Sequence, residues 1–143
     1  MGRKNRRKKE HIRPVSKSIA IQPKRLEIWY ASLPLDESTS VQGGSRPVII
    51  ISNDISNERS SIVTVIPMTT KVKHTGMPTH VVMGESMILA EQILTIDKKL
   101  LNKKIGDCSG MAKEIKEALM EQIGLSPEGK LSELPEGGRK EDE

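Results

Sequence analysis

The apolar residues of this chain come in short runs, which limits the folds open to it. The clearest runs are LEIWYASL (26–33), RPVIIIS (46–52), IVTVIPM (62–68) and THVVM (79–83). Runs of this length that are rich in β-branched residues are typical of strands and too short for helices. None approaches the ~20 apolar residues that a membrane-spanning helix requires. The pattern therefore predicts a β-rich domain.

The remaining segments up to residue 109 are weaker in pattern. We expect a further strand over MILAEQI, after a turn at Gly84–Glu85, and a weak strand over KKIGDCS (103–109). NDISNERSS (53–61) is expected to be a turn region, because it is polar and has no periodicity. LTIDKKLLNK (94–103) is expected to be a short helical or irregular connection.

One helix is predicted, over GMAKEIKEALMEQIGL. Met111, Ile115, Ala118 and Leu119 fall on one stripe at helical spacing, and charged residues take the other face. Ser109 is the expected N-cap and Gly124 the expected residue after the last turn. At least five short strands and one C-terminal helix favour a mainly β fold that closes into a small barrel or curls round a core.

Charge divides the chain into three parts. Residues 1–25 hold ten Lys or Arg against one Glu, so the overall charge of +4 comes from this end. We expect residues 1–24 to form a disordered basic arm, a solubilising segment or one that holds polyanions such as RNA. Residues 25–125 form the domain, and the acidic, Pro- and Gly-rich residues 126–143 are expected to be a second disordered tail.

Several chemistries find no support in the residues. The single cysteine, Cys108, cannot form an internal disulfide and is expected to pack in the core of a cytoplasmic protein. His11, His74 and His80 have no metal-ligand spacing, so no metal site is expected. Neither a dinucleotide fingerprint nor a Walker sequence occurs, so no cofactor is expected.

Two polar loops remain as places for chemistry, STSVQGGSRP (38–47) and PMTTKVKH (67–74). Glycines allow a backbone to approach a ligand, and arginine binds phosphate with a fixed fork of donors. Hydroxyls and lysines complete a set that could hold a phosphodiester without a metal. The same residues also have an ordinary interpretation as a surface arginine, turn glycines and solvated threonines.

The order of QGGSRPVIIISND, PTHV and AEQILTID resembles the MazF/PemK family of toxin endoribonucleases, over about residues 25–125. The resemblance implies an SH3-like barrel of the CcdB/PemK type with a C-terminal helix, acting as a homodimer. It implies metal-independent cleavage of single-stranded RNA, in which a 2′-OH attacks the adjacent phosphorus to give 2′,3′-cyclic phosphate and 5′-OH ends. A cognate antitoxin peptide would cover the RNA groove.

The resemblance places catalysis on Arg46, Thr69 and Ser40. Arg46 would stabilise charge, with proton transfer possible, while Thr69 and Ser40 would hold non-bridging oxygens. His74 could donate a proton, or could be an ordinary solvated histidine. The expected RNA-binding residues are Gln42, Gly43, Gly44, Thr70, Lys71, Lys73, Glu91 and Gln92.

Two positions depart from the family pattern. Leu26–Glu27 replaces the usual Gly-Asp before the first strand, and Val41 stands where the loop commonly has a glutamate. A non-nuclease toxin of the CcdB type that binds DNA gyrase stays open as an alternative, because such toxins use the same barrel. A catalytically inactive RNA-binding module is the other.

Overall fold

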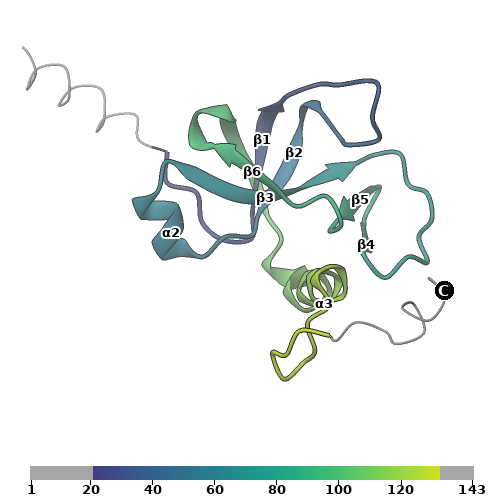
Figure 1. Ribbon diagram of the computed structural model, residues 1–143. Helices are drawn as coiled ribbons and strands as arrows, with labels where there is room; N and C mark the ends of the chain where they lie inside the picture. The colour runs from purple at the N-terminus through teal and green to yellow at the C-terminus, as the bar shows by residue number, and fades with distance from the viewer. Residues whose placement is uncertain (1–20, 133–143) are drawn as a thin grey trace, which may run out of the picture.

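The computed structural model describes residues 21–132 and shows a curled β-sheet with one helix packed at its end (Figure 1). The strands are β1 (Glu27–Leu33), β2 (Gly44–Ile50), β3 (Ile62–Thr69), β4 (His80–Met83), β5 (Ser86–Leu89), β6 (Leu94–Asp97) and β7 (Leu101–Asp107). The helices are α2 (Asp54–Arg59) and α3 (Ala112–Ile123), with 3-10 turns at Lys98–Leu100 and Ser109–Met111. The predicted mainly β fold with a C-terminal helix is confirmed.

All strand pairs are antiparallel, and the order is β4-β5-β3-β2-β1-β7, with β6 also paired to β3. Strand β3 makes the curl possible, because its parts pair with different strands. Residues 62–65 pair with β6, whereas Met68 and Thr69 pair with β5. The end of β3 therefore turns toward the loops that precede β2 and β4.

Both faces of the central strands are buried. Ile28, Ile49 and Ile66 contribute to a core beneath α3, and their neighbours Trp29, Val48 and Val65 contribute to a second core on the other side. Burial on both faces explains why Val48–Ile51 is apolar without alternation. Trp29 and Tyr30 face opposite sides, as strand geometry predicts: Trp29 is buried and Tyr30 is 39% exposed.

Helix α3 confirms the predicted C-terminal helix, but its start was predicted wrongly. Ser109 begins a 3-10 turn, and α3 starts at Ala112 with no side-chain cap. Gly124 ends the helix in the left-handed conformation (φ +67°), as expected. Cys108 is buried, as predicted, and its thiol donates to the carbonyl of Leu26 at 3.2 Å. Burial and the nearby Asp107 charge raise the pKa of Cys108 to about 11.

Two segments differ from the sequence-based expectation. Residues 54–59, expected to be a turn, form α2, because Asn53 caps its N-terminus and the buried Asn57 bonds to Ser52. Residues 94–97, expected to be a connection, form β6, because pairing with β3 outweighs the weak local pattern. The strand predicted over 87–93 ends at Leu89, where a turn begins.

The structure describes only the inner ends of the two predicted tails. Leu125 and Leu131 form an isolated antiparallel bridge around a tight turn. Most of the predicted basic arm and acidic tail, residues 1–20 and 133–143, lies outside the described residues. Within residues 21–132, no helix is long and apolar enough to cross a membrane.

Candidate active site

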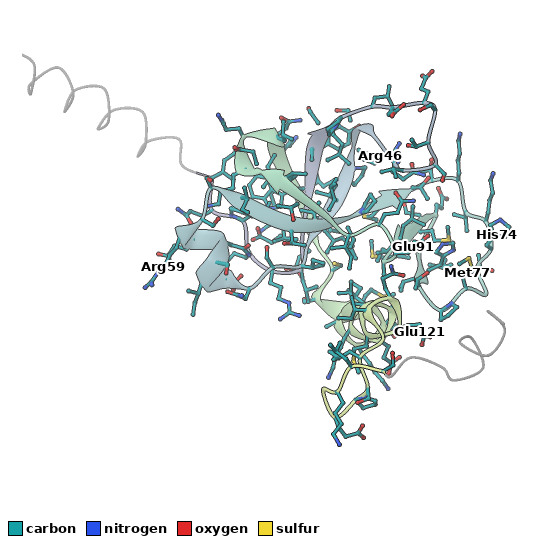
Figure 2. All side chains as sticks on the ribbon, in the orientation of Figure 1. Arg46, Arg59, His74, Met77, Glu91 and Glu121 are labelled. Carbon is teal, nitrogen blue, oxygen red and sulfur yellow. The ribbon has the colours of Figure 1, made fainter. Side chains whose placement is uncertain are left out.

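The two loops singled out in the sequence lie on one side of the molecule. The loop between β1 and β2 and the loop between β3 and β4 project from the same edge of the sheet (Figure 1). Arg46 and Glu91 lie toward this side, which also carries His74 and Met77, whereas Arg59 of α2 lies at the opposite end (Figure 2). The fold therefore brings together the polar segments that the sequence separates.

Arg46 is held by main-chain carbonyls on both sides. Its Nε–H donates to the oxygen of Gly43 at 2.9 Å, and Nη1 donates to the oxygen of Met68 at 3.1 Å. The first bond comes from its own loop and the second from β3. Within residues 21–132 the other guanidinium N–H groups have no protein acceptor, so they are available to an anionic ligand. A guanidinium keeps its charge at physiological pH, which makes Arg46 a fixed cation.

Arg46 lines a small pocket of about 250 Å³. Its lining residues are Tyr30, Ser45, Arg46, Pro47, Met68, Thr69, Thr70 and Ser86. The pocket combines one cation, one phenol and several hydroxyl groups, which suits a phosphate with its sugar. Larger hollows exist elsewhere. One of about 700 Å³ between β4 and α3 has no lysine or arginine in its lining, and one of about 550 Å³ beside α2 joins Arg25 to several hydroxyl groups but has no phenol.

Thr69 and Arg46, both predicted as catalytic, share this pocket. Thr69 ends β3, and its Oγ1 accepts a hydrogen bond from the N–H of Lys71 at 3.1 Å. That bond fixes the oxygen and leaves the hydroxyl proton free to donate to a ligand. Thr70 also lines the pocket. The pairing at the end of β3 thus places a hydroxyl donor beside the guanidinium.

Tyr30, Ser45 and Ser86 line the pocket but were not predicted as site residues. The alternation along the predicted strand was a sequence signal for Tyr30, because it places Tyr30 on the face opposite Trp29. The pairing that brings it to the site, with Pro47 next to Arg46, comes from the structure. Ser86 could not have been found from the sequence, since it comes from β5 and reaches the site only through the pairing of β5 with the end of β3.

The predicted catalytic Ser40 does not line this pocket. It lies in the exposed part of the β1–β2 loop, and its carbonyl accepts a hydrogen bond from Nε2 of Gln92 at 3.4 Å. The N–H of Gln42 donates to Oε1 of the same Gln92 at 2.8 Å. Gln92 was expected to read RNA bases. In the structure its amide fastens the loop that carries Ser40.

The two adjacent glycines serve different needs. A Cβ on Gly43 would clash with the carbonyl oxygen of Pro34 and lie 2.8 Å from Cα of Leu35, so close backbone packing requires a glycine there. Gly44 has φ +78°, which disfavours other residues. Both were expected to let phosphate approach. Their immediate task is to shape the turn whose Gly43 carbonyl holds Arg46.

Of the remaining predicted RNA-binding side chains, the two lysines are exposed to solvent and Glu91 is bound to another side chain of the protein. Lys71 and Lys73 are exposed in the β3–β4 loop and are placed to attract phosphates. Glu91 is paired with His80 at 2.8 Å. Burial would raise the pKa of Glu91, but hydrogen bonds, first that from His80, and the His80 charge hold it below the ordinary value. Glu91 is therefore an anion engaged within the protein.

Among residues 21–132, no three His, Cys, Asp or Glu side chains lie close enough together to hold a metal ion. From its own residues the site offers charge stabilisation by Arg46 and hydrogen bonding by hydroxyl and main-chain groups.

The chain matches a known family over most of the residues that the structure describes. Residues 24–123 fit the family described as PemK-like, MazF-like toxin of type II toxin-antitoxin system. Endoribonuclease EndoA of Bacillus subtilis (strain 168) is 37% identical over 111 residues, covering 71% of this chain and 95% of that protein.

Solved structures share the fold. An endoribonuclease in complex with its cognate antitoxin, from Mycobacterial species, superposes with a TM-score of 0.62 at 24% identity, over 73% of this chain and 97% of that one. MazF (Form-I) from Deinococcus radiodurans gives a TM-score of 0.63 at 18% identity, over 73% of this chain and 99% of that one. The small barrel predicted from the sequence is thereby confirmed.

Proposed function

Since the chain belongs to the PemK-like, MazF-like toxins of type II toxin–antitoxin systems, we propose that it is an endoribonuclease that cuts single-stranded RNA at the Arg46 pocket. The 37% identical relative is named an endoribonuclease, which supports the activity. The observation that carries the assignment of the site is the fixed guanidinium of Arg46. It is held by the Gly43 and Met68 carbonyls and stands beside the Thr69 hydroxyl.

In the proposed reaction the ribose 2′-oxygen attacks the adjacent phosphorus while its proton passes to a base or to solvent. The bond to the 5′-oxygen breaks, and that oxygen takes up a proton, leaving a 2′,3′-cyclic phosphate and a 5′-OH. The phosphorane carries more negative charge than the substrate. Arg46 stabilises that charge, because its position is set before RNA arrives and costs no reorganisation. The hydroxyl of Thr69 donates to a non-bridging oxygen.

The pocket has a volume of only about 250 Å³, so recognition of a short RNA sequence needs a longer surface. We propose that two copies of the chain form a homodimer whose facing loops make an RNA groove. Ser40, Gln42, Lys71 and Lys73 would lie along it. Binding occurs in the cytoplasm, where mRNA is translated, and a cognate antitoxin peptide blocks it by covering the groove. Size-exclusion chromatography with light scattering measures the dimer directly.

The test of catalysis compares two arginines. Purified protein is incubated with single-stranded RNA in EDTA, and the products are examined for 5′-OH and cyclic phosphate ends. Arg46→Ala is expected to lose cleavage by about a hundredfold or more, the cost of removing a main charge-stabilising donor. Arg59→Ala removes the same charge from exposed α2 and is expected to cut normally. Normal cutting by Arg46→Ala, or RNA binding without any cutting by the wild type, would overturn the proposal.

The basic arm has its own test. We propose that the basic arm, residues 1–24, adds phosphate contacts to RNA binding, because it holds nine Lys or Arg against one Glu. Deleting residues 2–20 is expected to weaken binding mainly at low salt and to flatten the dependence of affinity on salt. An unchanged salt slope would show that the arm makes no such contacts.

A further inference from the structure

His80 joins the β3–β4 loop to the body of the protein. It begins β4, and only 6% of its side chain is exposed. Its Nδ1 lies 2.9 Å from the carbonyl oxygen of His74 in the loop. Its Nε2 lies 2.8 Å from Oε2 of Glu91, which follows β5. One imidazole thus bridges a loop and the turn after a strand.

Both partners of this imidazole are hydrogen-bond acceptors. A carbonyl oxygen cannot donate, and a carboxylate is acceptor-only when ionised. A neutral imidazole has a single N–H, so it could satisfy only one of the two contacts. The geometry therefore fits an imidazolium, in which Nδ1–H donates to His74 and Nε2–H donates to Glu91.

The charges around the ring agree with this form. Burial alone would lower the pKa of His80, but the hydrogen bond to Glu91, the carbonyls of His74 and Lys73 and the Glu91 charge outweigh it and raise the pKa above 6.5. Glu114, Glu117 and Glu121 of α3 line the same hollow as His80 and add negative potential. Lys73 and His74 are the titratable groups on the loop side.

The loop has little else to hold it. Within the described residues, the other hydrogen bonds of residues 71–78 are local: Lys71 to Thr69, Met77 to His74, and His80 N–H to Met77. Most of its side chains are exposed. This loop starts at Thr69 and Thr70 in the pocket and carries Lys71 and Lys73. The end of the loop is also tied by the N–H of Ala90, which donates to the carbonyl of Thr79 at 2.9 Å. The His80 ring adds the contact that reaches into the loop, at His74, and so contributes to where the two lysines stand relative to Arg46.

We propose that His80 is a positioning residue of the nuclease: as an imidazolium it clamps the β3–β4 loop beside the Arg46 pocket, and loss of its proton releases the loop. The inference rests on the proposed function for its effect on RNA, but the clamp itself can be tested without RNA. The pH dependence of the clamp follows from the direction in which the pKa of His80 is shifted. The clamp is complete at pH 6.5 and below, and it is lost as pH rises through the raised pKa of His80.

The clamp is tested first by nitrogen NMR of the histidine rings and by amide hydrogen exchange of residues 72–77. At pH 6.5 both ring nitrogens of His80 are expected to carry protons, and loop exchange, corrected for its intrinsic pH dependence, is expected to accelerate as His80 titrates. Glu91→Gln keeps an acceptor oxygen but removes its charge, so it is expected to lower the pH of that transition. His74→Asn removes the loop imidazole and suits the left-handed backbone there (φ +52°), so the transition is expected to remain.

A single-proton His80 tautomer at pH 6.5 would overturn the proposal. Corrected loop exchange that does not change across the His80 titration would do the same.

The effect on RNA is tested with His80→Gln, whose amide can donate to only one of the two acceptors at a time. At pH 6.5 its KM for RNA is expected to rise about tenfold, the size expected for one charge-assisted hydrogen bond, with a smaller change in kcat. At a pH above the His80 transition found by NMR, where the wild-type clamp is open, the two KM values are expected to converge. An equal loss at both pH values in a folded variant would point to a general structural role and overturn the clamp. If the wild type cuts no RNA, the proposed function fails, and the NMR and exchange results alone decide whether the clamp exists.

Discussion

The main-chain N–H of Gln42 donates to Oε1 of Gln92 at 2.8 Å, across 50 residues of sequence. The neighbouring Glu91 holds the other loop through His80. Two consecutive side chains after β5 thus fasten the two loops that border the Arg46 pocket. Glu91 and Gln92 both lie in the segment that directly follows β5, so the two loops are attached to the same part of the protein.

Removing the Gln92 amide should loosen the β1–β2 loop. Gln92→Ala is expected to speed hydrogen exchange at the Gln42 amide and to lower kcat/KM for RNA about tenfold, because a half-buried donor loses its partner. Gln122→Ala, an exposed glutamine on α3, is the matched control and should change neither. A drop in kcat/KM with unchanged exchange at Gln42 would show that Gln92 acts on RNA directly and not through the loop.

Lysine should not replace Arg46. The guanidinium uses Nε and Nη1 to hold the Gly43 and Met68 carbonyls and still has donors for a ligand. A lysine ammonium is a single point of charge on a flexible stem and cannot do both in this geometry. Arg46→Lys is therefore expected to lose about a hundredfold in kcat while keeping the fold. Single-turnover cleavage kinetics check this, and near wild-type rates would mean that charge alone is sufficient.

Glu27 should make stability depend on acid pH. It is buried, accepts hydrogen bonds from Lys24 N–H and Trp29 Nε1, and pairs with Lys104 at 3.0 Å. Burial would raise its pKa, but these partners, led by Lys24, lower it below 4.5. Its stabilisation is present above pH 4.5 and is lost as pH falls through the folded-state pKa.

Glu27→Gln is accordingly expected to destabilise the protein by about 1–3 kcal/mol at pH 7 and by less at pH 3. Urea unfolding followed by circular dichroism measures both values, with exposed Glu58→Gln as the control. A difference that stays constant from pH 7 to pH 3 would contradict the prediction.

Leu26 has a backbone conformation that suits glycine. Its φ is +72°, at the position where the family pattern usually has glycine, and the strain costs about 1–2 kcal/mol in a residue with a Cβ. Its side chain packs partly against the core under α3. Leu26→Ala loses that packing and keeps the strain, whereas Leu26→Gly loses both.

The glycine variant should therefore be more stable than the alanine variant by about 1 kcal/mol in urea unfolding. Ala31→Gly within β1 provides the comparison and should destabilise, because glycine is unfavourable in a regular strand. An alanine variant at position 26 as stable as the glycine variant would show that the backbone there adapts without strain.

The sequence was informative where local pattern and tertiary environment agree. Short β-branched runs predicted β1 to β4, and helical spacing around Ile115 predicted α3. It failed for β6, because Leu94–Asp97 is a strand only through its pairing with β3. It also missed α2, whose cap at Asn53 and buried Asn57 give no apolar periodicity.

The candidate site was likewise only partly predictable from the sequence. Arg46 and Thr69, which the resemblance singled out, line one pocket, because each lies near the end of a recognisable strand. Ser86 could not be predicted, since only the curl of β3 brings β5 to the pocket. The contacts of Gln92 and Glu91 were also out of reach, because a polar side chain after a strand gives no sign of whether it faces a ligand or a loop.

The chain has one tryptophan, one tyrosine and no phenylalanine. Trp29 sits in a core with its indole N–H bonded to Glu27, and the next residue, Tyr30, lines the candidate pocket. The protein is thus optically simple. Fluorescence excited at wavelengths that only tryptophan absorbs reports on Trp29 in β1 alone. Quenching or a spectral shift of this fluorescence on adding RNA can therefore be assigned to that strand without an attached dye.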